Sequence, residues 1–206
     1  MTARSANGED ASGTVAEAQT LDEDERVALL ALARKAIDLF LTCGEYQKPV
    51  DARPAMNARS ACLVTLRHGA TGELRGCRGE VQARLPLVEA VARTALASAL
   101  DDPRFQPVSA DELPKLKIEI SVLSPICPIR PEQVEVGRHG LLVECGCRAG
   151  LLLPQVASEW GWSREEFLDA VCHKAGLPVG AWKNPSARLH EFECEVFGEG
   201  RTSVPE

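Results

Sequence analysis

The stretch Leu74-Arg75-Gly76-Cys77-Arg78-Gly79 places one thiol, two guanidinium groups and two glycines within six residues. A β-rich run over residues 61–66 and a glycine-containing turn precede it, so the sequence predicts a hairpin whose returning strand carries this hexapeptide. By the two-residue period of a strand, Arg75 and Cys77 share one face. Arg78 faces the other way unless a bulge at one of the glycines re-aims it.

The segment before the hairpin has apolar residues at helical spacing. It predicts an amphipathic helix over residues 21–42. Thr20 and Glu23 have the spacing of a capping box at its start, and Gly44 supplies a left-handed stop at its end.

The segments after the hairpin alternate between helical and strand patterns. A second helix with many small residues is predicted to end at Leu100, and residues 115–123 alternate as a half-buried strand. Further on, the sequence predicts a second hairpin at 140–153, a helix that begins with the Ser163–Glu166 capping box, and a single final strand at 188–197. The fold class is therefore α+β, with largely antiparallel sheets and flanking helices.

The prolines after residue 124 indicate a boundary between two subdomains. We expect a disordered tail at 1–20, because this stretch has little apolar surface to bury, and a short tail at 201–206. Between them lies one domain, 21–200, with a larger part at about 21–124 plus the strand 188–197, and a smaller part at about 125–187.

The net charge and the lack of long apolar runs exclude some classes of protein. The 206 residues carry a net charge of -7, which argues against a dedicated nucleic-acid binder, because such domains are usually basic. No apolar run reaches membrane-spanning length, and the first twenty residues contain no apolar signal segment. We therefore expect a cytoplasmic protein that uses neither nucleic acid nor membrane.

The eight cysteines contain no C-x-x-C pair. Only Cys145 and Cys147 are closely spaced, and no second ligand pair follows them at zinc-site spacing, so no metal site is predicted. Neither common glycine-rich nucleotide motif is present, and no cofactor is expected. Most of these thiols alternate with apolar residues, as small core side chains do.

Cys77 is the leading candidate nucleophile, because neighbouring arginines favour the thiolate. His139 would serve as its base if the second hairpin folds over the first. The alternative is that Cys77 is a buried, inert thiol.

The charged groups of the hexapeptide suggest an anion site. Arg75 and Arg78, together with the amides around Gly76 and Gly79, have the chemistry to bind a carboxylate or phosphate. The alternative is that Arg75 forms a structural ion pair with an aspartate at 101–102.

Three residues after the second helix are candidates for the same site. Asp102 and Arg104 flank a proline, and Phe105 would form a wall, since loops at helix ends often carry function. The alternative is a proline-assisted stop with Phe105 as a core plug.

Several ordered motifs between residues 21 and 197 resemble the AMMECR1-domain family. They are Glu73–Gly79, Ser98–Phe105, Asp111–Pro114, Ile120–Leu123, Gly137–Leu141, Leu153–Ala157 and Gly161–Trp162. The resemblance implies a two-part α/β domain whose hexapeptide lines a cleft between the two parts. The family usually has isoleucine where this chain has Arg78, and the substitution doubles the positive charge there.

The resemblance implies little chemistry, because the biochemical activity of the family is unsettled. It does imply association with Memo-like and radical SAM proteins, in what is called the AmmeMemoRadiSam system. The sequence therefore predicts an accessory or binding protein whose cleft holds an anionic small molecule or an acidic segment of a partner. A cysteine-dependent enzyme that uses Cys77 is the alternative, and RNA binding through a local basic groove is a third hypothesis.

Overall fold

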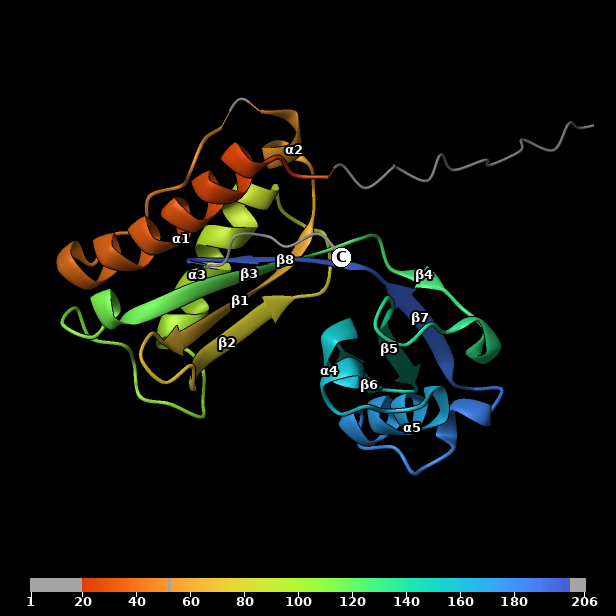
Figure 1. Ribbon diagram of the computed structural model, residues 1–206. Coiled ribbons are helices and arrows are strands. Elements are labelled where there is room, and N and C mark those ends of the chain that lie inside the picture. Colours follow the sequence, from red (N-terminus) through yellow and green to blue (C-terminus); the bar gives the residue numbers. More distant parts are fainter. Residues whose placement is uncertain (1–19, 52, 201–206) are drawn as a thin grey trace, which may run out of the picture.

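The computed structural model describes residues 20–51 and 53–200, and most of the two predicted tails lies outside these ranges. Two antiparallel four-stranded sheets, with strand orders β2-β1-β3-β8 and β4-β7-β5-β6, organise two lobes (Figure 1). The predicted α+β class with flanking helices is confirmed. No helix in the described part is long and apolar enough to cross a bilayer.

The first lobe holds the N-terminal helix, the first hairpin and the last strand. Its helices α1 and α3 lie against one face of the sheet (Figure 1), where their apolar side chains and those of the strands form the main core. Its elements are α1 (Glu23–Cys43), α2 (Pro54–Asn57), β1 (Ala61–His68), β2 (Leu74–Glu80), α3 (Leu87–Leu100), a 3-10 turn (Leu113–Lys115), β3 (Leu116–Leu123) and β8 (Cys194–Gly198).

Helix α1 begins two residues later than predicted, because Asp22 rather than Thr20 is its N-cap. The capping box is formed by Asp22 and Glu25, with Glu25 N donating to Asp22 Oδ1 at 2.7 Å and Asp22 N donating to Glu25 Oε2 at 3.1 Å. The predicted Thr20–Glu23 box is wrong because Leu21, which would be the first residue of that helix, is buried ahead of α1. The end is as predicted, at Gly44 with φ of 72°.

The second lobe is built around the second hairpin. Its helix α5 begins with the predicted Ser163–Glu166 capping box and packs on β5 and β6. Its elements are β4 (Cys127–Pro128), a 3-10 turn (Pro131–Gln133), β5 (Gly140–Cys145), β6 (Arg148–Leu152), α4 (Pro154–Glu159), α5 (Arg164–Lys174), a 3-10 turn (Ala181–Lys183) and β7 (Arg188–Phe192).

The predicted single strand at 188–197 is wrong, because the chain leaves one sheet and enters the other at Glu193. β7 lies in the second sheet and β8 in the first. Phe192 is fully buried in a small core shared by both lobes. The break also shifts which side chains of the last strand face the core: Val196 is 36% exposed, whereas Phe197 is buried.

Candidate functional site

The hexapeptide lies on β2, an edge strand of the first sheet that pairs with β1 as an antiparallel hairpin. The register is regular from Glu80 to Gly76 and then shifts, so that Arg75 has no partner on β1. The bulge is therefore at Arg75 and at neither predicted glycine. Because the pairing at Cys77 and Arg78 is regular, these two side chains leave opposite faces of the sheet.

Gly76 is the point where the hairpin touches helix α3. A Cβ atom at this position would lie 2.2 Å from Ser98 O, so any side chain would push the helix away. The Ser98 hydroxyl joins the two strands by accepting from Arg78 N at 2.9 Å and donating to Val64 O at 2.7 Å. The glycine and the serine thus place β2 close against α3.

Cys77 is half-buried, and its contacts differ from those that the sequence predicts. Its backbone N–H donates to Asp102 Oδ2 at 2.8 Å, and the Thr65 hydroxyl donates to its sulfur at 3.3 Å. Asp102 is nearly inaccessible, with 3% of its side chain exposed. The carboxylate therefore closes the outer edge of β2 at the position where another strand would pair.

Arg104 holds that carboxylate in place. Its Nε and Nη2 donate to the two Asp102 oxygens at 2.9 and 2.7 Å, and its backbone N–H donates at 3.1 Å. Chiefly through the Arg104 side chain, and also through the Cys77 and Arg104 amides, the pKa of Asp102 is held well below its usual range. The Arg104 guanidinium and the Cys77 amide therefore share one carboxylate.

Arg75 is paired as well, although not with the expected aspartate. Its Nε and Nη2 donate to the Glu112 carboxylate at 2.5 and 3.0 Å, and Nη2 also donates to Gln106 O at 2.9 Å. The guanidinium beside Glu112 lowers the pKa of that carboxyl. Arg75 therefore serves to fasten the loop after α3 to the edge strand.

Phe105 lies between the two paired arginines. The Cζ atoms of Arg75 and Arg104 lie 5.7 and 5.4 Å from its ring centre, within cation–π range. The ring is half-buried and belongs to no apolar core cluster, so the alternative of a core plug is wrong. The ring and the two ion pairs form a continuous clamp, the 102–112 clamp, over the start of β2.

Arg78 is the guanidinium of the hexapeptide that this clamp leaves free. Its side chain is exposed and makes no ion pair or hydrogen bond with another residue of the described part. Its side chain leaves the strand on the face opposite Cys77, which is the face on which Gly76 meets α3. A Cβ atom at the neighbouring Gly79 would lie 2.4 Å from Leu63 Cγ, so a side chain there would clash with β1.

His139 lies in the other lobe, directly before β5. Its Nδ1 accepts from Glu135 N at 3.2 Å, and its own N–H donates to Glu135 O at 3.0 Å. Across the described residues, no hydrogen bond or ion pair joins His139 to β2. Its role as the base for Cys77 stays a prediction that these contacts do not support.

Two other thiols pack against the cores: Cys62 is buried, and Cys194 is half-buried. Burial raises the pKa of Cys62 and of Cys194 to about 12 in each case, so both stay protonated. Burial also raises the pKa of Cys172. Cys62 and Cys172 are the small buried core residues that the sequence predicts, whereas Cys43 and Cys147 are exposed.

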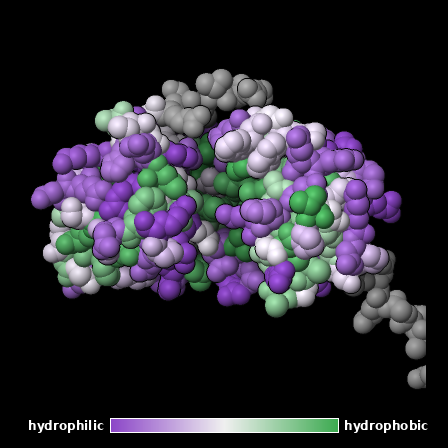
Figure 2. Space-filling model, turned by 90° about the horizontal axis from the view of Figure 1, so that it is seen from below, coloured by the Kyte–Doolittle hydropathy of each residue, from purple (hydrophilic) through white to green (hydrophobic). Residues whose placement is uncertain are grey.

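The larger of two notable cavities, about 830 Å³, lies at the junction of the lobes. It is lined by the residues that follow the hexapeptide, Val81, Gln82 and Ala83, and by the two segments that cross between the sheets. Seen from below, the molecule is hollowed between its lobes, with hydrophobic residues deep in the hollow (Figure 2). Residues 74–79 do not line the cavity itself.

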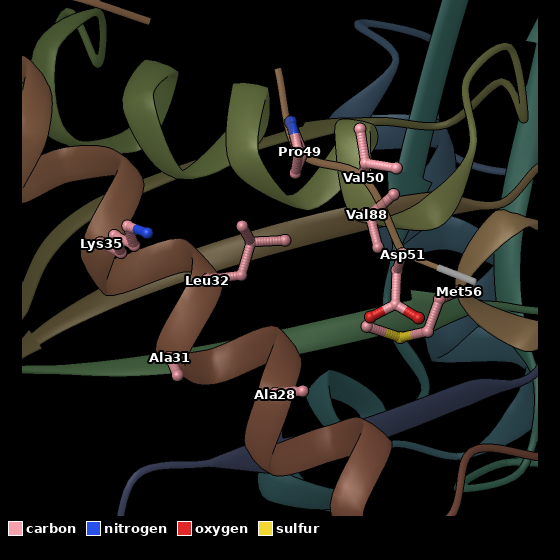
Figure 3. Close-up of a pocket in the computed structure, with 9 residues that line it drawn as sticks. All are labelled: Ala28, Ala31, Leu32, Lys35, Pro49, Val50, Asp51, Met56 and Val88. Carbon is pink, nitrogen blue, oxygen red and sulfur yellow. The ribbon is translucent and has the colours of Figure 1, made fainter. Parts of the chain in front are cut away.

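A smaller cavity, of about 240 Å³, opens between α1 and the segment at 49–51 (Figure 3). Its volume is below the usual range for ligand pockets. Asp51, which lines this cavity, is already paired with Arg53 at 2.6 Å. We therefore place no site there.

Sequence reasoning missed the residues that complete the clamp. Glu112 and Ser98 lie within motifs that the family resemblance quotes, but no local pattern shows that they contact β2. Their partners are 37 and 20 residues away along the chain, and only the hairpin and loop geometry brings them together.

Comparison with known proteins gives a consistent family. The AMMECR1 profile matches residues 30–197. A protein of Thermococcus gammatolerans is 45% identical over 181 residues, covering 83% of this chain and 88% of its own length. The Methanothermobacter thermautotrophicus relative is 40% identical over 187 residues, covering 87% and 96%.

A solved structure shows the same fold. The crystal structure of the uncharacterized protein PH0010 from Pyrococcus horikoshii is 42% identical in sequence and aligns with a TM-score of 0.78, covering 84% of this chain and 90% of that one. The profile match, the identity to these relatives and the shared fold agree, and the chain belongs to the AMMECR1 family.

Proposed function

We propose that this protein is an accessory protein that binds a carboxylate-bearing or phosphate-bearing anion on the β2 surface around Arg78. The observation that supports this is that the three arginines differ in whether they are paired with a carboxylate. Arg75 and Arg104 are each paired with a carboxylate, whereas the Arg78 guanidinium is exposed and without an acidic partner in the described residues. An unpaired guanidinium on a rigid strand is suited to bidentate recognition of a carboxylate or phosphate.

The clamp supports this function by making β2 rigid. It fastens the strand at Arg75 and closes the edge at the Cys77 amide, while the Ser98 hydroxyl fixes the Arg78 amide. A fixed backbone lowers the entropic cost of holding a ligand at Arg78. The anion has two candidate sources, a small molecule and an acidic segment of a Memo-like or radical SAM partner, and both present the same oxygen ligands.

Binding of two simple probes tests the proposal. We expect hexaglutamate or citrate to bind the full chain saturably at low ionic strength, with affinity falling as salt is added. Arg78→Ala should weaken binding by about fivefold, the scale of one exposed ion pair. Tighter binding of the peptide would favour an acidic segment, and tighter binding of citrate would favour a small molecule.

Arg67→Ala is the matched control. Arg67 is an exposed arginine on the neighbouring strand β1 and has no acidic partner among the described residues. Its loss should leave both affinities within twofold of the parent chain. Equal losses for the two variants would show only diffuse charge attraction, and unchanged affinity in Arg78→Ala would overturn the proposal.

A thiol enzyme is the second candidate, and one observation favours it. Cys77 is half-buried rather than sealed, unlike Cys62, and it receives a hydrogen bond from Thr65. The contacts that a cysteine nucleophile needs are less favourable, because the Arg104 guanidinium is paired with Asp102 and His139 is bonded to Glu135. The binding function is therefore the one that the geometry supports better.

A further inference from the structure

The cavity at the lobe junction has the size and lining of a small-molecule site. Its volume of about 830 Å³ falls within the usual range for ligand pockets. Its walls come from the start of α1, the segment before β1, the exit of β2 and both chain crossings. Buried apolar side chains form much of its floor, namely Leu21, Ala61, Leu87 and Leu123.

Of the two arginines that line the cavity, one has no acidic partner among the described residues. Glu195 is paired with Arg26 at 2.7 Å, and Glu193 is paired with Arg138 of the second lobe at 2.8 Å. Arg59, which also lines the cavity, makes no ion pair within the described residues. Its Nη1 donates to Arg84 O, which holds the side chain at the rim and leaves its charge without a partner.

We propose that this cavity binds a small amphipathic carboxylate, with the apolar body on the floor and the acidic group on Arg59. An apolar floor favours a ligand with a hydrocarbon or aromatic body, since burial of apolar surface drives binding. The single unpaired guanidinium favours one acidic group at the rim. This site is separate from the Arg78 surface, because none of residues 74–79 lines the cavity.

The test uses dansyl-labelled undecanoic acid as the probe and its uncharged primary amide as the comparison ligand. Equilibrium dialysis of the full chain against each is expected to show saturable binding with one site per chain. Arg59→Gln should weaken binding of the acid about tenfold, the scale of one charge-assisted hydrogen bond, and leave the amide within twofold.

A second variant probes the volume of the cavity. Ala83 is exposed at its rim, so Ala83→Trp fills the entrance without disturbing the core. We expect the acid and the amide both to bind at least tenfold more weakly to this variant. Circular dichroism and the thermal midpoint should match those of the parent chain.

Arg78→Ala separates this inference from the proposed function, and it should leave the affinity of the acid within twofold. Full affinity in both Arg59→Gln and Ala83→Trp would overturn the inference and point to another surface, such as the exposed Trp160. Absence of saturable binding to the parent chain would overturn it as well. Neither result would bear on hexaglutamate or citrate binding at Arg78.

Discussion

Gly76→Ala is expected to destabilise the protein by about 3 kcal/mol, at the upper end of the range for overpacked interiors. The new methyl group would lie 2.2 Å from the backbone oxygen of Ser98, and a backbone atom inside α3 cannot rotate away as a flexible side chain can. For a chain of this length the thermal midpoint should fall by roughly 6–12 °C. Differential scanning calorimetry measures both quantities.

Gly198→Ala is the matched control, because it adds the same atom to the same sheet. The nearest atom to a Cβ at Gly198 is Ile118 O, at 3.3 Å, which requires a shift of only a few tenths of an ångström. We expect this variant to lose less than about 1 kcal/mol. Equal losses at the two positions would contradict the close contact between β2 and α3.

Asp102→Asn is expected to cost about 2 kcal/mol at neutral pH. The amide group of asparagine would turn a donor toward either the Cys77 amide or the Arg104 side chain, each of which now donates to the carboxylate. The expected loss of stability is moderate because the Arg104 side chain is 54% exposed, so water solvates its guanidinium when the carboxylate is lost. Asp101→Asn, at the neighbouring exposed position, should change the free energy of unfolding by less than about 0.5 kcal/mol.

The same substitution gives a defined pH dependence. The pKa of Asp102 in the folded protein is depressed, so its carboxylate stabilises the fold at pH values above the unfolded pKa of about 4. This contribution is lost as the pH falls through the folded pKa. The difference in unfolding free energy between the parent chain and Asp102→Asn should therefore stay level from pH 8 to 5 and shrink below about pH 4. A difference that grows on acidification would contradict the role of Asp102 in the clamp.

Features set by neighbouring residues were predictable from the sequence. The stop of α1 at Gly44, the capping box of α5 and the strand at β3 each follow from residues within one element. The family resemblance added the expectation of two parts around a cleft. These predictions succeed because capping and the periodicity of apolar residues act over a few positions.

Features that depend on distant contacts were not predictable. The alternation at 188–197 is that of one continuous strand, and only the packing of Phe192 between the lobes requires the break at Glu193. Likewise, Arg75 has two aspartates nearer in sequence, at 101 and 102, than the glutamate that it binds. The bulge at Arg75 directs its side chain toward Glu112, and no pattern in the sequence predicts this bulge.

The contacts within the candidate site differ from those that the sequence predicts. Arg75, Cys77, Asp102, Arg104 and Phe105 do come together, as the sequence suggested. Arg104 is paired with Asp102 and Arg75 with Glu112, however. The two arginines of the hexapeptide do not converge on one anion. Their convergence would require both side chains on one face, whereas Arg75 is in the bulge and Arg78 is in the regular ladder.

The rate of alkylation at each cysteine tests most directly whether the hexapeptide is a binding scaffold or a thiol active site. Iodoacetamide at neutral pH, followed by mass spectrometry of the peptides, compares half-buried Cys77 with exposed Cys43 in the same chain. We expect Cys77 to react no faster than Cys43, because Arg75 and Arg104 are each paired with a carboxylate, Arg78 leaves the opposite face of the strand, and no base among the described residues is hydrogen-bonded to the Cys77 sulfur. Faster reaction at Cys77, despite its lower exposure, would reveal an activated thiolate and contradict the account.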